Sequence, residues 1–139
     1  MHVITVTRTT TAEPEAIWAL WADVPNRTRW DDALEHATLD GPFQPGVCGV
    51  VKLKGQPERK FAILDCVPLQ RYTDRFFLPM GGKMDWVHTI TEVAGGREVT
   101  FAIGVTGPTS RILAFVMKKI LGRELPPTVD KLISLAEQV

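Results

Sequence analysis

Hydrophobic and polar residues alternate with a period of two along several short stretches of the chain. Residues 3–10 show this pattern and are rich in Val and Thr, which favours a β-strand. The same pattern predicts further strands over residues 34–40, 47–54, 59–67, 70–78, 83–93 and 97–106. Tight turns rich in Gly and Pro separate most of these stretches. The chain is therefore predicted to form seven strands in an antiparallel sheet.

The last part of the chain, residues 108–139, follows a helical period instead. Its apolar residues recur at spacings of three and four, which indicates one broad helical face: Ile112, Leu113, Phe115, Val116, Met117, Ile120 and Leu121. We expect this helix to lie against the sheet, because no other element is large enough to cover it.

Gly122 and the pair Pro126-Pro127 interrupt the helical pattern. A proline inside a helix removes a hydrogen-bond donor and clashes with the preceding turn. We therefore predict a break or sharp kink between Leu121 and Thr128, followed by a second helical segment that runs to the end.

A short helix is predicted over residues 11–22, directly after the first strand. Pro14 suits the first turn, and Glu13 and Glu15 lie at the positive end of the helix dipole. Val24-Pro25 ends this helix, and a second short turn or helix over residues 26–29 leads to Trp30.

Strand alternation and turn length together assign an inner face to the sheet. They place Val51 opposite Phe61, Phe61 opposite Phe76, Asp65 opposite Tyr72 and Ile90 opposite Phe101. The predicted inner residues are Phe61, Ile63, Asp65, Tyr72, Asp74, Phe76, Leu78, Met84, Trp86, His88, Ile90, Val99, Phe101, Ile103 and Val105.

The hairpin around Gly81-Gly82 allows two registers. A two-residue turn would direct Asp74 outward, whereas an odd loop such as residues 80–82 keeps Tyr72 and Asp74 inside. We prefer the odd loop, which makes Asp74 and His88 direct neighbours on adjacent strands.

Four of the predicted inner residues are polar: Asp65, Tyr72, Asp74 and His88. A buried carboxylate costs free energy unless it has a partner, so this group indicates water, a polar ligand group or mutual pairing. Desolvation would raise the pKa of Asp74 and a nearby imidazolium would lower it, and the sequence leaves both open.

Composition narrows the function classes. The chain has 139 residues, which indicates one domain over residues 1–139, with 45% hydrophobic and 23% charged residues. Sixteen basic and sixteen acidic residues give a net charge of zero, which argues against nucleic acid as a partner. No apolar run is long enough for stable membrane insertion, and no signal-peptide pattern is present. A cytoplasmic protein is the simplest expectation.

No cofactor or metal site is predicted. Cys48 and Cys66 have no metal-ligand spacing and are expected on the outer face of the sheet. The three histidines fall on separate segments, and the chain has no glycine-rich phosphate loop. Homodimerisation through an edge strand or the outer sheet face is compatible with the sequence.

The order of these elements resembles the helix-grip superfamily, the START, polyketide-cyclase and birch-pollen-allergen-like group known as SRPBCC. The likeness covers nearly the whole chain and is carried by residues 12–18 (Ala-Glu-Pro-Glu-Ala-Ile-Trp), 30–32 (Trp-Asp-Asp), 41–46, 67–71 and 132–137. The resemblance implies an α+β fold in which a seven-stranded antiparallel sheet wraps around the last helix, with two short helices after the first strand. The proline interruption departs from the continuous helix of the family.

The resemblance also implies an apolar cavity between sheet and helix, because members bind lipids, sterols, polyketides or similar molecules. Some members are aromatase/cyclases, and others bind proteins. The superfamily has no universal catalytic motif, so no catalytic residue is assigned. The candidate ligand-binding residues are Trp30, Phe61, Asp65, Tyr72, Asp74, Phe76, Met84, Trp86, His88, Phe101, Ile103, Leu113 and Met117.

Three functions remain open at this point. The first is a carrier or sensor of a hydrophobic small molecule, with Tyr72, Asp74 and His88 orienting its polar end. The second is a polyketide cyclase or dehydratase in which His88 moves protons and Asp74 orients it. The third is a protein-interaction module of the chaperone-activator type, with a filled cavity and an exposed apolar patch.

Several candidate residues also have a plainly structural interpretation. Trp30 is either a cavity-lining residue or a core anchor. His88 is either functional or a histidine satisfied by Asp74 or the backbone. Lys118, Lys119 and Arg123 belong either to the solvated side of the last helix or to a basic patch that faces a membrane.

Overall fold

The computed structural model describes every residue from Met1 to Val139. In chain order its elements are β1 (His2–Thr10), α1 (Pro14–Ala22), the 3-10 helix η1 (Val24–Arg29), β2 (Leu34–Leu39), β3 (Cys48–Leu53), β4 (Arg59–Val67), β5 (Arg71–Phe77), the 3-10 turn η2 (Pro79–Gly81), β6 (Lys83–Val93), β7 (Gly96–Thr106) and α2 (Ser110–Glu137). All seven predicted strands are present, and each boundary lies within one residue of its expected position.

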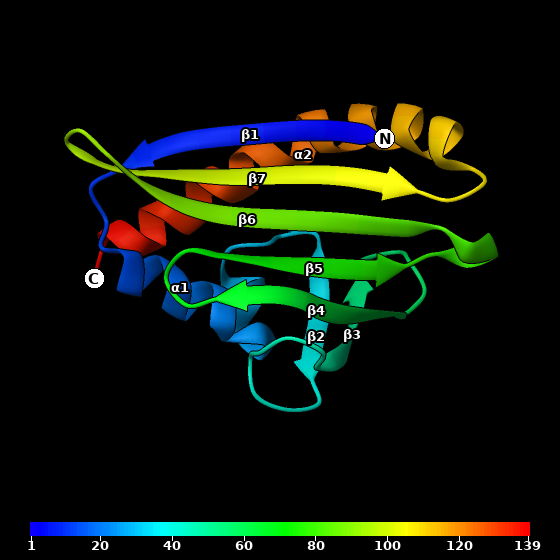
Figure 1. Ribbon diagram of the computed structural model, residues 1–139, viewed down its shortest axis with the longest axis horizontal. Coiled ribbons are helices and arrows are strands. Elements are labelled where there is room, and N and C mark those ends of the chain that lie inside the picture. Colours follow the sequence, from blue (N-terminus) through cyan, green and yellow to red (C-terminus); the bar gives the residue numbers. More distant parts are fainter.

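The strands form one antiparallel sheet in the order β1-β7-β6-β5-β4-β3-β2. The sheet curls, so that β2 and β3 run steeply across the direction of β4 and β5 (Figure 1). The long helix α2 runs diagonally along one face, where it packs against β1, β7 and α1. This arrangement is the α+β helix-grip fold that the sequence predicted.

The helix α2 corrects one expectation. It continues from Ser110 to Glu137 as one helix that contains Pro126 and Pro127. In Figure 1 it passes behind β1 and β7 and continues toward the C-terminus. The break predicted between Leu121 and Thr128 is therefore wrong.

Packing explains why α2 continues through the prolines. Its buried side keeps a spacing of four across them, with Leu121, Leu125 and Val129 all inside the core. Gly122 and Pro127 lie on the exposed side, where water can satisfy the carbonyl groups that lose their donors to proline. Burial of the apolar face therefore outweighs the lost hydrogen bonds.

The β3–β4–β5 region keeps the predicted faces. Phe61 lies opposite Phe76, as expected. On its other side, Phe61 lies opposite Gly49 rather than Val51. The predicted pairing of β3 with β4 is therefore wrong by two residues. A shift of two leaves every side chain on the same face of the sheet, so the predicted inner residues of these strands are unaffected by it.

The β6–β7 hairpin shows the same kind of shift. Its turn is Ala94–Gly95, and Ile90 lies opposite Val99 rather than Phe101. Phe101 still faces inward, where it is fully buried.

The β5–β6 hairpin has the odd loop that we preferred, but a longer one. Phe77 pairs with Lys83, which leaves residues 78–82 as the loop. Asp74 therefore faces inward as predicted. The residue opposite Asp74 is Trp86, and the expected pairing of Asp74 with His88 is wrong.

A β-bulge in β4 corrects two further expectations. The register shifts between Ile63 and Cys66, which exchanges the faces of the residues that follow it. Asp65 is therefore not an inner residue, and it forms a surface ion pair with Arg71 at 3.0 Å. Cys66, expected on the outer face, packs against the core instead, with its Sγ 3.7 Å from the Phe43 carbonyl oxygen.

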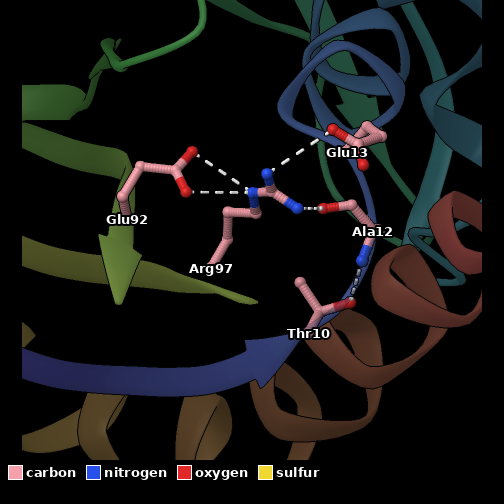
Figure 2. A network of polar contacts seen from close by, with 5 residues as sticks. All are labelled: Thr10, Ala12, Glu13, Glu92 and Arg97. Carbon is pink, nitrogen blue, oxygen red and sulfur yellow. Dashed lines mark hydrogen bonds and ion pairs between the residues drawn. The ribbon is translucent and has the colours of Figure 1, made fainter. Parts of the chain in front are cut away.

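A polar network fixes the start of α1 to the sheet (Figure 2). Arg97 at the beginning of β7 contacts Glu92 at 3.2 Å and Glu13 at 3.5 Å, and it donates a hydrogen bond to the Ala12 carbonyl oxygen at 3.5 Å. Thr10 accepts a hydrogen bond from the Ala12 backbone N–H at 3.1 Å. These contacts place the inner side of α1, with Ile17 and Trp21, over the sheet.

Two groups of buried apolar residues form the core. The larger fills the space between the sheet, α1 and α2, and it includes Trp21, Phe101 and Val129. The smaller lies under the curled end of the sheet and includes Val24 and Phe61. Asp74 lies on the sheet between these two groups, opposite Ile63 of the smaller one and Trp86 beside the larger one.

Candidate functional site

A buried ion pair occupies the centre of the inner face of the sheet. Arg27 of η1 donates a hydrogen bond from Nη1 to Oδ2 of Asp74 on β5 at 2.9 Å, and the two side chains are 8% and 3% exposed. Arg27 also donates from Nε to the Trp21 carbonyl oxygen at 3.0 Å. The pair therefore ties η1 and the end of α1 to the middle of the sheet.

The sequence did not identify Arg27. Arg27 and Val24 are three residues apart in a 3-10 helix, so both point to the same side and both are buried. The available signal was Asp74 itself, because a buried carboxylate requires a partner and arginine is the cation best suited to burial. Nothing in the sequence selects Arg27 among the other arginines.

His88 has a different environment from the one expected. It does not pair with Asp74, and its Nδ1 lies 3.3 Å from the Tyr72 carbonyl oxygen. Its ring stacks on the Tyr72 ring with a centroid distance of 4.0 Å, and Trp21 and Phe101 contact it edge-on. The backbone of Tyr72, and not Asp74, is therefore the partner of the His88 ring.

Burial determines the protonation of the site. Burial raises the pKa of Asp74, and the charge and hydrogen bond of Arg27 oppose that rise. For Arg27, burial by itself would lower the pKa, but the charge and hydrogen bond of Asp74, together with Tyr72 and Asp31, outweigh burial and the pKa is raised. Because a guanidinium stays charged in proteins, an ionised Asp74 is the state that leaves no unpaired buried charge.

The other two titratable groups are neutral. Burial, together with the positive charge of Arg27, lowers the pKa of His88 well below its ordinary value. Burial raises the pKa of Tyr72 well above its ordinary value. Near pH 7 the site therefore contains one ion pair, a neutral imidazole and a neutral phenol.

Five buried polar atoms of this region make no hydrogen bond within the protein. They are Nη2 of Arg27, Oδ1 of Asp74, the Tyr72 hydroxyl, and the indole nitrogens of Trp21 and Trp86. Native proteins pair nearly all such atoms with protein or water. The site can therefore receive a polar group that both accepts and donates hydrogen bonds.

Aromatic side chains surround the polar atoms. Trp18, Trp21 and Phe43 contact the Tyr72 ring edge-on, with centroid distances of 6.0, 5.3 and 4.9 Å. The Arg27 guanidinium lies 5.3 Å from the Tyr72 centroid and 5.8 Å from that of Phe43. These rings occupy the centre of the space between sheet and helices, where the family resemblance implies an apolar cavity.

Two surface hollows lie away from this centre. One, of about 390 Å³, lies between the start of α1 and the end of α2. The other, of about 280 Å³, lies over β6 and β7 and is lined by Val87 and Ala102 of the outer face.

The predicted ligand-binding residues fall into three groups. The buried group contains Trp30, Phe61, Tyr72, Asp74, His88, Phe101 and Ile103. The half-buried group contains Phe76, Met84 and Trp86 on the sheet, with Leu113 and Met117 on α2. Asp65 lies apart from both, because the bulge turns it away.

Trp30 has the contacts of a core anchor. Its indole nitrogen donates to the Leu20 carbonyl oxygen at 3.4 Å, and its ring meets Phe101 edge-on at 6.4 Å. The half-buried residues are the part of the predicted set that solvent or a ligand reaches directly.

Solved structures with the same fold have very different sequences. Protein MLL2253 from Mesorhizobium loti has a TM-score of 0.75 at 16% identity, covering 98% of this chain and 97% of that chain. A START superfamily protein from Mycobacterium smegmatis has a TM-score of 0.72 at 16% identity, covering 99% of both chains. StfQ, a di-domain aromatase/cyclase of the steffimycin biosynthetic pathway, has a TM-score of 0.78 at 8% identity, covering 99% of this chain and 51% of its own.

The family comparison covers almost the whole sequence. Residues 1–137 match the family model described as polyketide cyclase / dehydrase and lipid transport. A search of curated proteins finds no match.

Proposed function

This chain belongs to the polyketide cyclase / dehydrase and lipid transport family, and from that premise we propose that it binds an oxygenated hydrophobic small molecule on the inner face of its sheet, as a carrier or sensor. The observation that carries the proposal is the set of buried polar atoms without protein partners inside an aromatic site. Leaving such an atom unpaired costs about 1–3 kcal/mol, so a ligand that pairs them gains affinity as well as orientation.

The proposed ligand has two parts. Its oxygen group lies beside Asp74 and Trp86, which lie opposite each other on the adjacent strands β5 and β6. The Trp86 indole supplies a donor and Oδ1 of Asp74 supplies an acceptor, so a hydroxyl group suits both. Its apolar part lies against the half-buried Met84, Leu113 and Met117, which contact the larger core group.

The chemistry of the site favours binding over catalysis. His88 is stacked on Tyr72, and its pKa lies well below the ordinary value, so its imidazole accepts a proton poorly near pH 7, where a general base must work. Asp74 is held by Arg27, and the phenol of Tyr72 stays protonated. No group here is placed to move a proton.

The first test is native mass spectrometry of protein purified without detergent. We expect a small molecule that co-purifies and is lost on denaturation. A clean mass of the protein alone, unchanged after incubation with fatty acids and aromatic polyketides, would contradict the carrier function.

A second test examines the polar atoms with two matched probes, 2-naphthol and naphthalene. We expect the wild-type protein to bind 2-naphthol about tenfold more tightly than naphthalene, because one hydrogen bond to a buried partner is worth roughly 1–2 kcal/mol. Trp86→Phe should remove much of this preference. Trp18→Phe, which changes a half-buried ring beside Tyr72, is the control and should keep it.

A second ion pair, between β5 and β6, supplies the control for Asp74. Arg75 and Asp85 form an ion pair at 2.7 Å that is more than a quarter exposed, and they point to the opposite face from Asp74. Asp74→Asn should reduce the binding of 2-naphthol, whereas Asp85→Asn should not. Equal losses in the two variants would argue that the effect comes from the stability of the sheet.

A further inference from the structure

One end of the molecule exposes large apolar side chains from two segments. On the first half of α2, Ile112 is 71% exposed, Phe115 63%, Val116 43% and Ile120 42%. On η2, Met80 is 76% exposed. We call these five residues the end patch.

The two segments of the end patch lie beside each other. Figure 1 places η2 and the beginning of α2 at the same end of the molecule. A Cβ added at Gly107 would lie 2.9 Å from the Gly82 Cα, so the loops that precede α2 and follow η2 are in direct contact. Met80 adopts a positive φ of 61°, which is unusual for a residue with a bulky side chain.

Ligand binding on the inner face does not account for the end patch. On the same helix, Leu113 and Met117 pack against the core. Ile112, Val116 and Ile120 form the neighbouring row, with a spacing of four, and Phe115 lies further round the helix. The apolar surface of α2 is therefore wider than the sheet covers.

Basic residues surround the end patch. Between Gly107 and Arg123 the chain contains Arg111, Lys118, Lys119 and Arg123 but no Asp or Glu. The Lys119 Nζ lies 4.4 Å from the centroid of the Phe115 ring, so positive charge and apolar surface are interleaved. The chain as a whole has a net charge of zero, which makes this a local excess.

We propose that the end patch docks onto the surface of an anionic lipid bilayer. An apolar helix surface bordered by lysine and arginine inserts its side chains at the headgroup boundary while its charges meet anionic lipids. A second copy of the chain fits less well, because two end patches would bring the same positive charges together. In this proposal the protein binds to the surface of the bilayer and does not cross it.

No helix of the structure has both the length and the apolar character that crossing a membrane requires.

The test is flotation of the protein with vesicles of phosphatidylcholine alone, or with part of the phosphatidylcholine replaced by phosphatidylglycerol. We expect binding at least about tenfold stronger to the anionic vesicles, and weaker binding at high salt because the charges are exposed. Binding that is absent, or equal for both vesicle types, would overturn the proposal.

Two pairs of variants locate the contact. Lys118→Glu with Lys119→Glu should reduce anionic vesicle binding at least about tenfold, whereas Lys54→Glu with Lys60→Glu, on exposed lysines of the β3–β4 hairpin, should not. Phe115→Ser should also reduce binding, whereas Leu64→Ser, at a position 37% exposed on β4, should not. Because all these positions are exposed, circular dichroism should show an unchanged fold.

The remaining outcomes identify other occupants. If Phe115→Ser dissociates a wild-type dimer in sedimentation and vesicles do not bind, the occupant is a second copy and the proposal is wrong. If vesicles do not bind but acidic proteins do, the occupant is a protein and the proposal is equally wrong. Neither result bears on the ligand site, because 2-naphthol binding is measured without vesicles.

Discussion

At the scale of single residues, the buried polar groups depend on one another. Arg27 neutralises Asp74, and its positive charge also helps to keep His88 uncharged. Removing one partner of a buried ion pair typically costs about 3–5 kcal/mol, because the other charge is left unpaired. The function of these residues and their contribution to stability are therefore measured separately, through matched variants.

His88 should make the protein sensitive to acid. In the unfolded chain it takes up a proton near its ordinary pKa of about 6.5, whereas burial and Arg27 lower its pKa in the folded state. The unfolded state then binds more protons below this pH, so the free energy of unfolding should fall as the pH falls. The slope for one proton is at most about 1.4 kcal/mol per pH unit.

The measurement is urea unfolding as a function of pH for the wild type and His88→Phe. The variant should show a flatter dependence below about pH 6.5. The raised pKa of Asp74 acts in the opposite direction, since its contribution is lost as the pH rises through the raised value, but it is common to both proteins. His36→Phe, at an exposed position, is the control. Parallel curves for wild type and His88→Phe would contradict the prediction.

At the scale of elements, α2 shows burial overriding local preference. Pro126 and Pro127 lie inside a helix of 28 residues. Each proline in a helix interior costs about 3 kcal/mol relative to alanine. The helix persists because Leu121, Leu125 and Val129 continue one buried face past the prolines.

Replacing Pro127 by alanine should stabilise the protein. The change restores a backbone N–H at an exposed position but also makes the unfolded chain more flexible, which offsets about 0.4–1 kcal/mol. We expect a net gain of about 2 kcal/mol in the free energy of unfolding, measured in urea. Pro57→Ala, in the exposed β3–β4 turn, should give no gain. A loss of stability in Pro127→Ala would indicate that the packing of α2 requires a bend that proline imposes.

At the scale of the whole molecule, the sheet and the helices meet at Trp21. This residue is fully buried, and it contacts Tyr72 on β5, His88 on β6 and Phe101 on β7. It therefore connects α1 to three neighbouring strands of the sheet, β5, β6 and β7. The neighbouring Trp18 is only half-buried and reaches Tyr72 from the edge of the same group.

Trp21→Ala should destabilise the protein by about 3–5 kcal/mol, because removing a fully buried Trp leaves a large cavity. Trp18→Ala should cost distinctly less, since part of its surface already faces water. Thermal and urea unfolding of the two variants measure this difference. Equal losses would show that α1 is anchored as much through its exposed side as through Trp21.

The sequence predicted which residues of each strand face inward, but it did not predict which residues lie opposite each other on neighbouring strands. A shift of two residues moved Phe61 opposite Gly49 and Ile90 opposite Val99 without changing any face. Alternation has a period of two, so it cannot distinguish registers that differ by two. The bulge in β4 is the one place where a face changed, and no turn residue marked it in the sequence.

The candidate site was predicted only in part, for the same reason. Tyr72, Asp74 and His88 could be placed on the inner face because the alternation of apolar and polar residues along a strand assigns each side chain to one face of the sheet. Their partners were not, because Arg27 comes from a segment 47 residues before Asp74, and local patterns carry no information on such distant contacts.

The sequence by itself determined the seven strands, the two segments before β2, the long last helix and the inward orientation of Tyr72, Asp74 and His88. These follow from the spacing of apolar residues and from Gly and Pro in turns, which act over a few residues. Only the tertiary structure decided the partner of Asp74, the turn of Asp65 to the surface, the continuity of α2 and the filling of the centre by aromatic rings. Each of these depends on which distant surfaces are buried together, and that burial can outweigh what the local sequence prefers.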